Sequence, residues 1–367
     1  MQKNRIRYLD IYKGLGIVLV VLGHMEATPY FWKLLLNAFH MPLFFVAAGL
    51  LTGEGRLYER ESGSVIRDRA RSILIPYFWF SLIGILWDCA KEFFAPMPHS
   101  FTGISGKVWD AISFFGISVL WFLPVFFVGA TGYQLLRKKL AYPAALALLA
   151  SLAVGLCAFK GVPGQAAGME MSAGVFLLKL ASTVLRGCMG MFFCALGEGM
   201  GILVRCLAER KWVLALAGAG LTGAGLTGAG SWLSVVNVRV SGYPVSFCYM
   251  LLGNGALFIL AALCLTGGTL FLCCLPGRFA PLEYLGKHSL AIMVTHLDMR
   301  VIYIAQKAGG LALAATGRLF IQHIALFAVM VILELFWIWL LNGCLGFLMG
   351  KRKNTGAQIV QKEERRK

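Results

Sequence analysis

Charged residues are scarce in this 367-residue chain, where Asp, Glu, Lys and Arg together make up 14%. A water-soluble domain normally carries about 25% charged residues. Hydrophobic residues reach 59% and fall in long blocks that short basic segments separate. Each block approaches the ~20 residues with which an α-helix crosses the bilayer core. This composition excludes a soluble globular protein and predicts an all-α, polytopic integral membrane bundle.

Acidic residues are the scarcer charge, because 17 Asp and Glu stand against 34 Lys and Arg and leave a formal net charge of +17. Such an excess also occurs in nucleic-acid-binding proteins. Here the basic residues lie in connections and at both ends of the chain, not on one amphipathic face or arm. Membrane proteins distribute their basic residues in this way, so we expect the bilayer as a partner and no nucleic acid.

A metal-binding cysteine pattern is also absent. The ten cysteines have no metal-ligand spacing, and the adjacent Cys273 and Cys274 are too close together for ordinary bridging. Others, such as Cys157, Cys194 and Cys264, lie inside apolar blocks. Cysteines in such surroundings behave as small buried hydrophobes. We therefore expect free thiols, no disulfide framework and no metal site.

The hydrophobic pattern predicts ten transmembrane helices and no appended soluble domain. A basic start followed by an apolar run resembles a signal peptide, but no small-residue cleavage site follows, so we expect a retained first span. The domain is predicted over 1–350, and the charged tail 351–367 is expected to be disordered. The predicted helices are 9–27, 34–52, 73–91, 112–136, 142–159, 175–204, 212–232, 245–275, 285–306 and 319–349.

The basic residues also predict an orientation. With the N-terminus in the cytoplasm, the inner connections and ends carry about three times as many Lys and Arg as the outer connections. The positive-inside rule then places both termini in the cytoplasm, which agrees with an even number of helices. We expect a multi-pass protein of the plasma (inner) membrane. Its oligomeric state stays open.

The segment 217–230 reads AGAGLTGAGLTGAG and superficially resembles a phosphate-binding loop. It lacks the Lys-Ser/Thr of a phosphate loop and the strand-to-helix context of a dinucleotide fingerprint. Glycines at this spacing in an apolar segment favour close packing between helices, which is the prediction here.

Ionisable side chains inside membrane spans are costly and mark function more often than in soluble cores. Lys13 and His24 share the first predicted helix eleven residues apart, which is roughly 16 Å along one face. Asp10 could pair with Lys13, and a lysine that merely extends to the cytoplasmic surface is the alternative. The ionisable residues within predicted spans are Asp10, Lys13, His24, His40, Arg186, Glu198, His296, Asp298 and Glu334.

Two histidines lie near the outer end of the first helical hairpin. His24 closes the first helix, and His40 follows a short connection in the phrase FHMPLFF. A histidine in a partly dry site suits general acid–base work. Two interfacial histidines satisfied by water or backbone are the alternative.

The segment 7–49, with LDIYKG at 9–14 and a histidine eleven residues after its lysine, resembles the start of the acyltransferase 3 family of membrane O-acyltransferases. The segment FHMPLFF followed by Gly49 resembles the matching segment of the family's sugar O-acetylase-like subgroup. Lys13 stands where many members have Arg, so the bidentate contact of a guanidinium is lost there.

Later phrases resemble the same family in the same order. LIPY at 74–77 follows a basic stretch, LWFL occupies 120–123, and LGKHSL at 285–290 precedes His296. Each phrase is weak alone, but together they cover most of the helical part.

The resemblance implies transfer of an acyl group, usually acetyl, from a cytoplasmic coenzyme A thioester to a hydroxyl of a carbohydrate or lipid-linked glycan. It implies that His24 acts as base or acyl carrier, which the sequence does not separate. His40 would orient His24 or the acceptor, and Lys13 would orient the donor.

The resemblance further implies that Arg67, Arg69 and Arg71 hold the donor phosphates, although the positive-inside rule explains the same arginines without a ligand. Trp121 and Phe122, together with His296, are predicted to line the substrate path, with core packing as the alternative for the two aromatic residues. His296 and Asp298 are two residues apart in one predicted helix and therefore point in different directions.

A transporter is the competing prediction, because buried charges and glycine-rich spans also occur there. No internal repeat relates the two halves of the chain, which weighs against it. A membrane sensor or scaffold would not require histidines at hairpin ends. Glu198 and Glu334 are predicted to line a cavity or to pair with Arg186, without an assigned role.

Overall fold

The computed structural model describes residues 7–55, 57–94, 102–159, 161–167, 169–170, 172–208, 212–275 and 279–351. Helices dominate these residues, and the only β pairing among them is an isolated bridge between Ser246 and Leu251. The predicted tail 351–367 lies almost entirely outside the described residues. The all-α prediction is confirmed for the described part of the chain.

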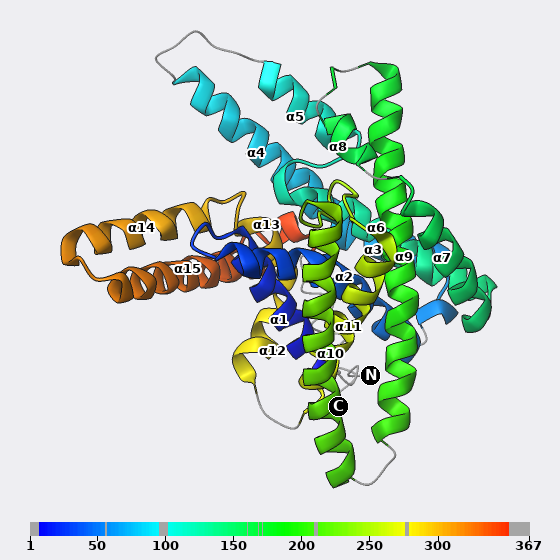
Figure 1. Ribbon diagram of the computed structural model, residues 1–367. Coiled ribbons are helices and arrows are strands. Elements are labelled where there is room, and N and C mark those ends of the chain that lie inside the picture. The colour runs from blue at the N-terminus through cyan, green and yellow to red at the C-terminus, as the bar shows by residue number, and fades with distance from the viewer. Residues whose placement is uncertain are drawn as a thin grey trace, which may run out of the picture.

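Most of the fifteen α-helices of the described residues lie in one bundle, from which α14 and α15 project (Figure 1). They are α1 (Arg7–His24), α2 (Tyr30–Glu54), α3 (Ser62–Arg69), α4 (Ile75–Phe93), α5 (Thr102–Ile112), α6 (Phe122–Lys139), α7 (Tyr142–Leu156), α8 (Val162–Ala167), α9 (Ala173–Ala208), α10 (Trp212–Ser241), α11 (Gly255–Cys273), α12 (Ala280–Lys287), α13 (Ser289–Thr295), α14 (Val301–Thr316) and α15 (Leu319–Asn342).

Six helical stretches of the described residues are long and apolar enough to cross a membrane. They are Tyr30–Glu54, Ser62–Phe93, Ser118–Lys139, Ala173–Cys206, Gly255–Cys273 and Leu319–Asn342. The count of ten spans is therefore not confirmed. These apolar helices fit a membrane protein, and α14 and α15 form a hairpin that projects from the bundle (Figure 1).

Three of the predicted helices are not continuous in the structure. The predicted helix 112–136 is interrupted after α5, where Phe114, Gly116 and Ser118 have positive φ, before a 3₁₀ turn at Ser118–Trp121 leads into α6. Side chains disfavour this left-handed backbone region, so a helix cannot continue through it. Apolar composition alone does not reveal such breaks.

The other two interruptions have the same cause. The first residues of the predicted helix 245–275 form turns in which Met250 and Gly253 have positive φ, and α11 begins only at Gly255. The predicted helix 285–306 is divided among α12, α13 and α14, with Arg300 at φ 57° just before α14. The last predicted helix ends at Asn342, followed by a 3₁₀ turn at Gly346–Met349.

Glycines allow α1 and α12 to approach closely. A Cβ on Gly14 would lie 1.9 Å from the Leu282 carbonyl oxygen, and one on Gly286 would lie 1.8 Å from that of Asp10. Any side chain at either position would force the two backbones apart. The contact places the phrase 9–14 against the phrase 285–290.

The glycine repeat packs as predicted where its side chains are described. A Cβ on Gly223 would meet Leu272 and the Gly268 carbonyl, and one on Gly230 would meet Leu265. This face of α10 therefore lies against α11, and the repeat is a continuous helix rather than a phosphate loop. All ten cysteines fall within the described residues and are free thiols.

Candidate active site

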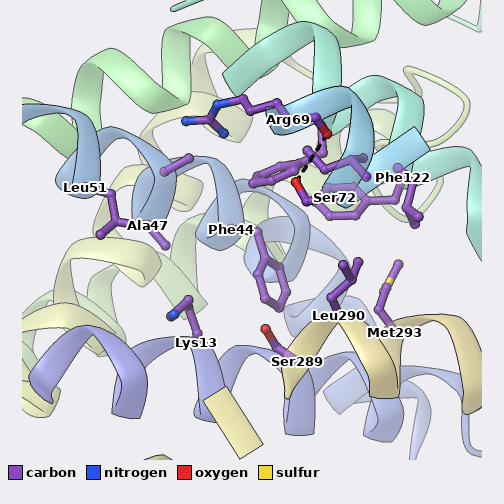
Figure 2. A pocket seen from close by; sticks show the side chains of 14 residues that line it. Lys13, Phe44, Ala47, Leu51, Arg69, Ser72, Phe122, Ser289, Leu290 and Met293 are labelled. Carbon is purple, nitrogen blue, oxygen red and sulfur yellow. Dashed lines mark hydrogen bonds between the residues drawn. The ribbon is translucent and has the colours of Figure 1, made fainter. Parts of the chain in front are cut away.

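A cavity of about 270 Å³, named here the cation cavity, lies between α1, α2, α6 and the region around α3 and α13. Lys13 and Arg69 reach it from different sides, with Phe44 and Phe122 between them (Figure 2). Apart from these two cations and two serines, Ser72 and Ser289, its lining is apolar. A site of this kind suits a ligand with an anionic part and a slender apolar part.

Both cations of this cavity are held in place by neighbours. Lys13 Nζ lies 2.9 Å from Asp10 Oδ1, as the spacing predicted. Arg69 donates from Nε and Nη2 to Gln134 Oε1 at 3.2 and 3.1 Å, and Gln134 is buried. This arrangement orients the guanidinium and leaves Nη1 for a ligand.

The backbone changes its winding directly after Arg69. Residues Ala70–Leu74 form a π-helical turn between α3 and α4. Such turns are frequent at functional sites because they rotate the residues that follow. Here Ser72 and Ile73 line the cavity with Arg69, whereas Arg67 and Arg71 do not. The predicted donor contact of Arg67 and Arg71 has no counterpart in this cavity and stays a prediction.

The sequence phrases that are far apart along the chain meet here. Lys13 comes from the phrase 9–14, Ile73 borders the phrase 74–77, and Phe122 and Leu123 come from 120–123. Ser289 and Leu290 come from 285–290 (Figure 2). The spatial convergence explains why these short phrases occur together in one chain.

A second cavity, of about 140 Å³, contains both predicted catalytic histidines and is named here the histidine cavity. His24 ends α1, and His40 lies in the buried part of α2, close to Pro42. Asn37, Trp121 and Cys248 also line the cavity. The prediction that His24 and His40 lie close together is therefore confirmed by their shared cavity.

The helix backbone sets the hydrogen positions of these rings. His24 Nδ1 lies 2.8 Å from the Val20 carbonyl oxygen, and His40 Nδ1 contacts that of Leu36. A carbonyl oxygen only accepts, so each Nδ1 is the donor. In each neutral ring Nε2 then keeps its lone pair and can accept a proton. This is the tautomer that a general base requires.

His296 repeats the pattern beside His24. Its Nδ1 lies 2.9 Å from the Ile292 carbonyl oxygen, and its ring centroid lies 5.1 Å from that of His24. The side chain is fully buried, and Nε2 has no hydrogen-bond partner among the described residues. His296 follows α13 and Asp298 lies in the next turn, so the prediction that both occupy one helix is wrong.

Trp121 and Phe122 separate the two cavities. Trp121 lines the histidine cavity and Phe122 lines the cation cavity, and their rings meet edge to face at 5.9 Å. Phe122 also packs against Phe44 and Phe45. Two of the three predicted path residues, Trp121 and Phe122, therefore stand between the cations and the histidines, whereas His296 lines neither cavity.

A fully buried arginine supports the wall of the histidine cavity. Arg186 donates to the carbonyl oxygens of Ser182, Phe115 and Cys248, and its guanidinium lies 5.4 Å from the Trp121 ring. In the described part of the chain no carboxylate pairs with it. It ties the loop before α6 to the loop before α11, and sequence reasoning gave no sign of this role.

Glu198 has a different partner from the predicted one. Arg137 Nη2 lies 2.9 Å from Glu198 Oε1, and Tyr133 donates to Oε2 at 2.5 Å. Of the two alternatives predicted for Glu198, pairing with Arg186 is wrong, because the two residues lie twelve positions apart on α9 and have different neighbours. Among the described residues no three His, Cys, Asp or Glu side chains are arranged to hold a metal ion.

Comparison with known proteins gives two related sequences and one family. A 133-residue segment is 34% identical to the nodulation protein NolL of Sinorhizobium fredii and covers 33% of each chain. A 105-residue segment is 31% identical to NolL of Mesorhizobium japonicum and covers 26% of this chain and 27% of that protein. The similarity thus spans about a third of these relatives or less. No solved structure matches this one.

The family comparison covers nearly the whole chain. The acyltransferase domain family matches residues 6–347, a range that includes every residue of both cavities. The order of the sequence phrases and their meeting around the cation cavity agree with that match. This chain belongs to the acyltransferase 3 family of membrane proteins.

Proposed function

We propose that this protein is a membrane O-acyltransferase that moves an acetyl group from coenzyme A to a hydroxyl of a carbohydrate. One observation carries the proposal: a cavity with two cations and a cavity with two basic imidazole nitrogens adjoin the same aromatic pair, Trp121 and Phe122. A two-substrate transfer needs an anion-binding donor site next to a proton-accepting acceptor site.

The donor enters at the cation cavity in this proposal. Arg69 Nη1 and Lys13 Nζ bind its phosphates from the cytoplasmic side, where the positive-inside rule places both termini. Lys13 contributes a point charge, whereas the guanidinium of Arg69 contributes directed hydrogen bonds. The thioester then extends past Phe122 toward His24.

The acceptor hydroxyl binds in the histidine cavity. His24 Nε2 takes the hydroxyl proton, the acceptor oxygen attacks the thioester carbonyl carbon, and the carbon–sulfur bond breaks. The leaving thiolate takes the proton from His24 and departs as free coenzyme A. His40 Nε2 positions the acceptor, and the His296 ring packs against that of His24.

The direct test uses purified protein in lipid nanodiscs with radiolabelled acetyl-CoA and a set of glycan acceptors. We expect label in the acceptor, and a loss of about 10²- to 10⁴-fold in His24→Ala, as for other general bases. Thermal unfolding of the variant checks that it folds. Wild-type turnover in folded His24→Ala would refute the assignment.

The same assay separates the remaining alternatives. Rapid release of one equivalent of coenzyme A without acceptor, with label left on the protein, would make His24 an acyl carrier. Uptake of a solute without consumption of acetyl-CoA would favour a transporter instead. Membership of an acyltransferase family argues against the transporter.

A further inference from the structure

A third cavity, here called the groove, lies outside the two cavities described above. It runs between α1 and α15 and has a volume of about 490 Å³, within the range of small-molecule sites. Its lining is almost wholly apolar and includes Ile17 and Val21 of α1, Ile292 of α13, and Met330 and Ile338 of α15. Neither the donor nor the acceptor head group in the proposed reaction uses it.

One carboxyl group interrupts this apolar lining. Glu334 is 7% exposed, and its Oε2 accepts a hydrogen bond of 2.9 Å from Thr295 Oγ1. Its Oε1 has no hydrogen-bond partner among the described residues. A buried oxygen without a hydrogen-bond partner is energetically unfavourable. A ligand with a hydroxyl or amide at this point would remove that cost.

The groove borders the bilayer. Its outer wall, α15, is apolar along most of its length, and only 22% of its most hydrophobic stretch is buried within the protein. The hairpin of α14 and α15 projects from the bundle (Figure 1), so α15 meets lipid on the faces that the bundle leaves free. A ligand therefore reaches the groove from the membrane, and its larger part is an apolar chain.

The groove also adjoins the candidate base. Val21 and Met25, which line it, lie shortly before and directly after His24, the last residue of α1. On the other side, Thr295 hydrogen-bonds to Glu334, and the next residue, His296, packs against the His24 ring. A chain in the groove would therefore hold an attached polar head beside the histidine cavity.

We propose that the groove binds the apolar chain of a glycolipid acceptor, and that Glu334 hydrogen-bonds to a hydroxyl or amide near the junction of chain and head. This inference rests on the proposed function, because it names the class of acceptor. It predicts that lipid-attached sugars bind before transfer and that free sugars are poor acceptors. Ordinary bilayer lipid filling the groove is the competing occupant.

The test measures whether a ligand occupies the groove, independently of acyl transfer. A dodecyl glycoside with a diazirine in its chain is photolysed with the protein in nanodiscs, and a phospholipid with the same diazirine chain serves as the comparison. We expect the glycoside to label peptides of α1 and α15, and tenfold excess unlabelled dodecyl glycoside to suppress that labelling at least fivefold. Unlabelled phospholipid should not suppress it.

Four variants locate the label and test the role of Glu334. Met330→Trp fills the groove and should remove the competable labelling, whereas Ile332→Trp, at a position on α15 that is 64% exposed and outside the groove, should retain it. Glu334→Leu should lose the preference for the glycoside over the phospholipid. Glu334→Gln, which still hydrogen-bonds, should keep most of it.

Each result bears on the inference. Equal, non-competable labelling by both probes would mean bulk lipid in the groove, and no labelling by either would mean that protein covers it; both outcomes overturn the proposal. The proposed function fails separately, if the bound glycoside receives no acetyl group from labelled acetyl-CoA. Selective labelling together with transfer that is at least tenfold faster than to the free sugar supports both.

Discussion

The two cations of the cation cavity already have partners within the chain, whereas the two histidines of the histidine cavity each keep a nitrogen that can accept a proton. Asp10 holds Lys13, and Gln134 holds Arg69. By contrast, His24 and His40 use Nδ1 to bond to their own helix backbones and direct Nε2 elsewhere. The two cavities therefore suit different tasks, one holding a charged molecule in place and the other accepting a proton.

This difference has a physical origin. Cations near a membrane need counter-charges or hydrogen-bond acceptors when no ligand is bound, because an unpaired charge at low dielectric is costly. A neutral imidazole carries no such penalty, so its free lone pair persists in a small, partly dry cavity. Variants of the two cavities should therefore change different kinetic constants.

The largest effect expected from the cation cavity comes from Arg69→Ala. Charge-assisted hydrogen bonds contribute about 1.5–3 kcal/mol, so kcat/KM for acetyl-CoA should fall about 10- to 100-fold, mainly through KM. Arg67→Ala is the matched control, because Arg67 is two residues away, exposed and outside the cavity. Steady-state kinetics with varied acetyl-CoA measure both variants.

Equal losses of activity in Arg69→Ala and Arg67→Ala would contradict a specific role for the cation cavity. They would mean that the basic segment acts through its overall charge or through membrane orientation rather than through a directed contact.

Lys13→Arg should retain much activity, since it keeps the charge, and Lys13→Ala should raise the donor KM. An unchanged donor KM in Lys13→Ala would make Lys13 only a surface anchor.

Much of the first hairpin could be predicted from sequence, because its signals are local. The spacing of Lys13 and His24 on one helix, the pair of Lys13 with Asp10, and the closeness of His24 and His40 depend only on helix geometry and a short connection. The structure agrees on all three. The family phrases also indicated which segments would meet, although not how.

What the sequence did not reveal depends on tertiary contacts. The breaks near Phe114, Met250 and Arg300 come from positive φ in residues that usually avoid it, and hydropathy does not report backbone conformation. The position of Arg71 relative to Arg69 depends on the π-helical turn that begins at Ala70. The partner of Glu198, and the loops that Arg186 ties together, are fixed by packing between distant segments.

A smaller effect tests whether the cation cavity depends on the close approach of α1 and α12. In Gly14→Ala the new Cβ would lie 1.9 Å from the Leu282 carbonyl oxygen. Overpacking of this kind costs about 1–3 kcal/mol and should displace Ser289 from Lys13. We expect a lower unfolding temperature and a donor KM raised by several-fold, with the acceptor KM unchanged.

Gly225→Ala supplies the control for that variant. A Cβ at Gly225 meets nothing within 4 Å, and alanine favours a helix over glycine by up to about 1 kcal/mol. Stability should therefore rise slightly or stay the same, with unchanged kinetics. If Gly14→Ala behaved like Gly225→Ala, the contact between the two family phrases would not position the donor site.

The smallest effect is expected on the histidine side, from His40→Phe. Phenylalanine preserves an aromatic ring but removes Nε2 and the Nδ1 hydrogen bond to Leu36. Loss of one neutral hydrogen bond to the acceptor, worth about 0.5–1.5 kcal/mol, should lower kcat/KM for the acceptor about two- to tenfold.

The donor KM should not change, because Phe122 and Trp121 separate His40 from the cation cavity. Kinetics with each substrate varied in turn measure this separation. A raised donor KM in His40→Phe would show that the two cavities act as one site, and the division of tasks between them would then be wrong.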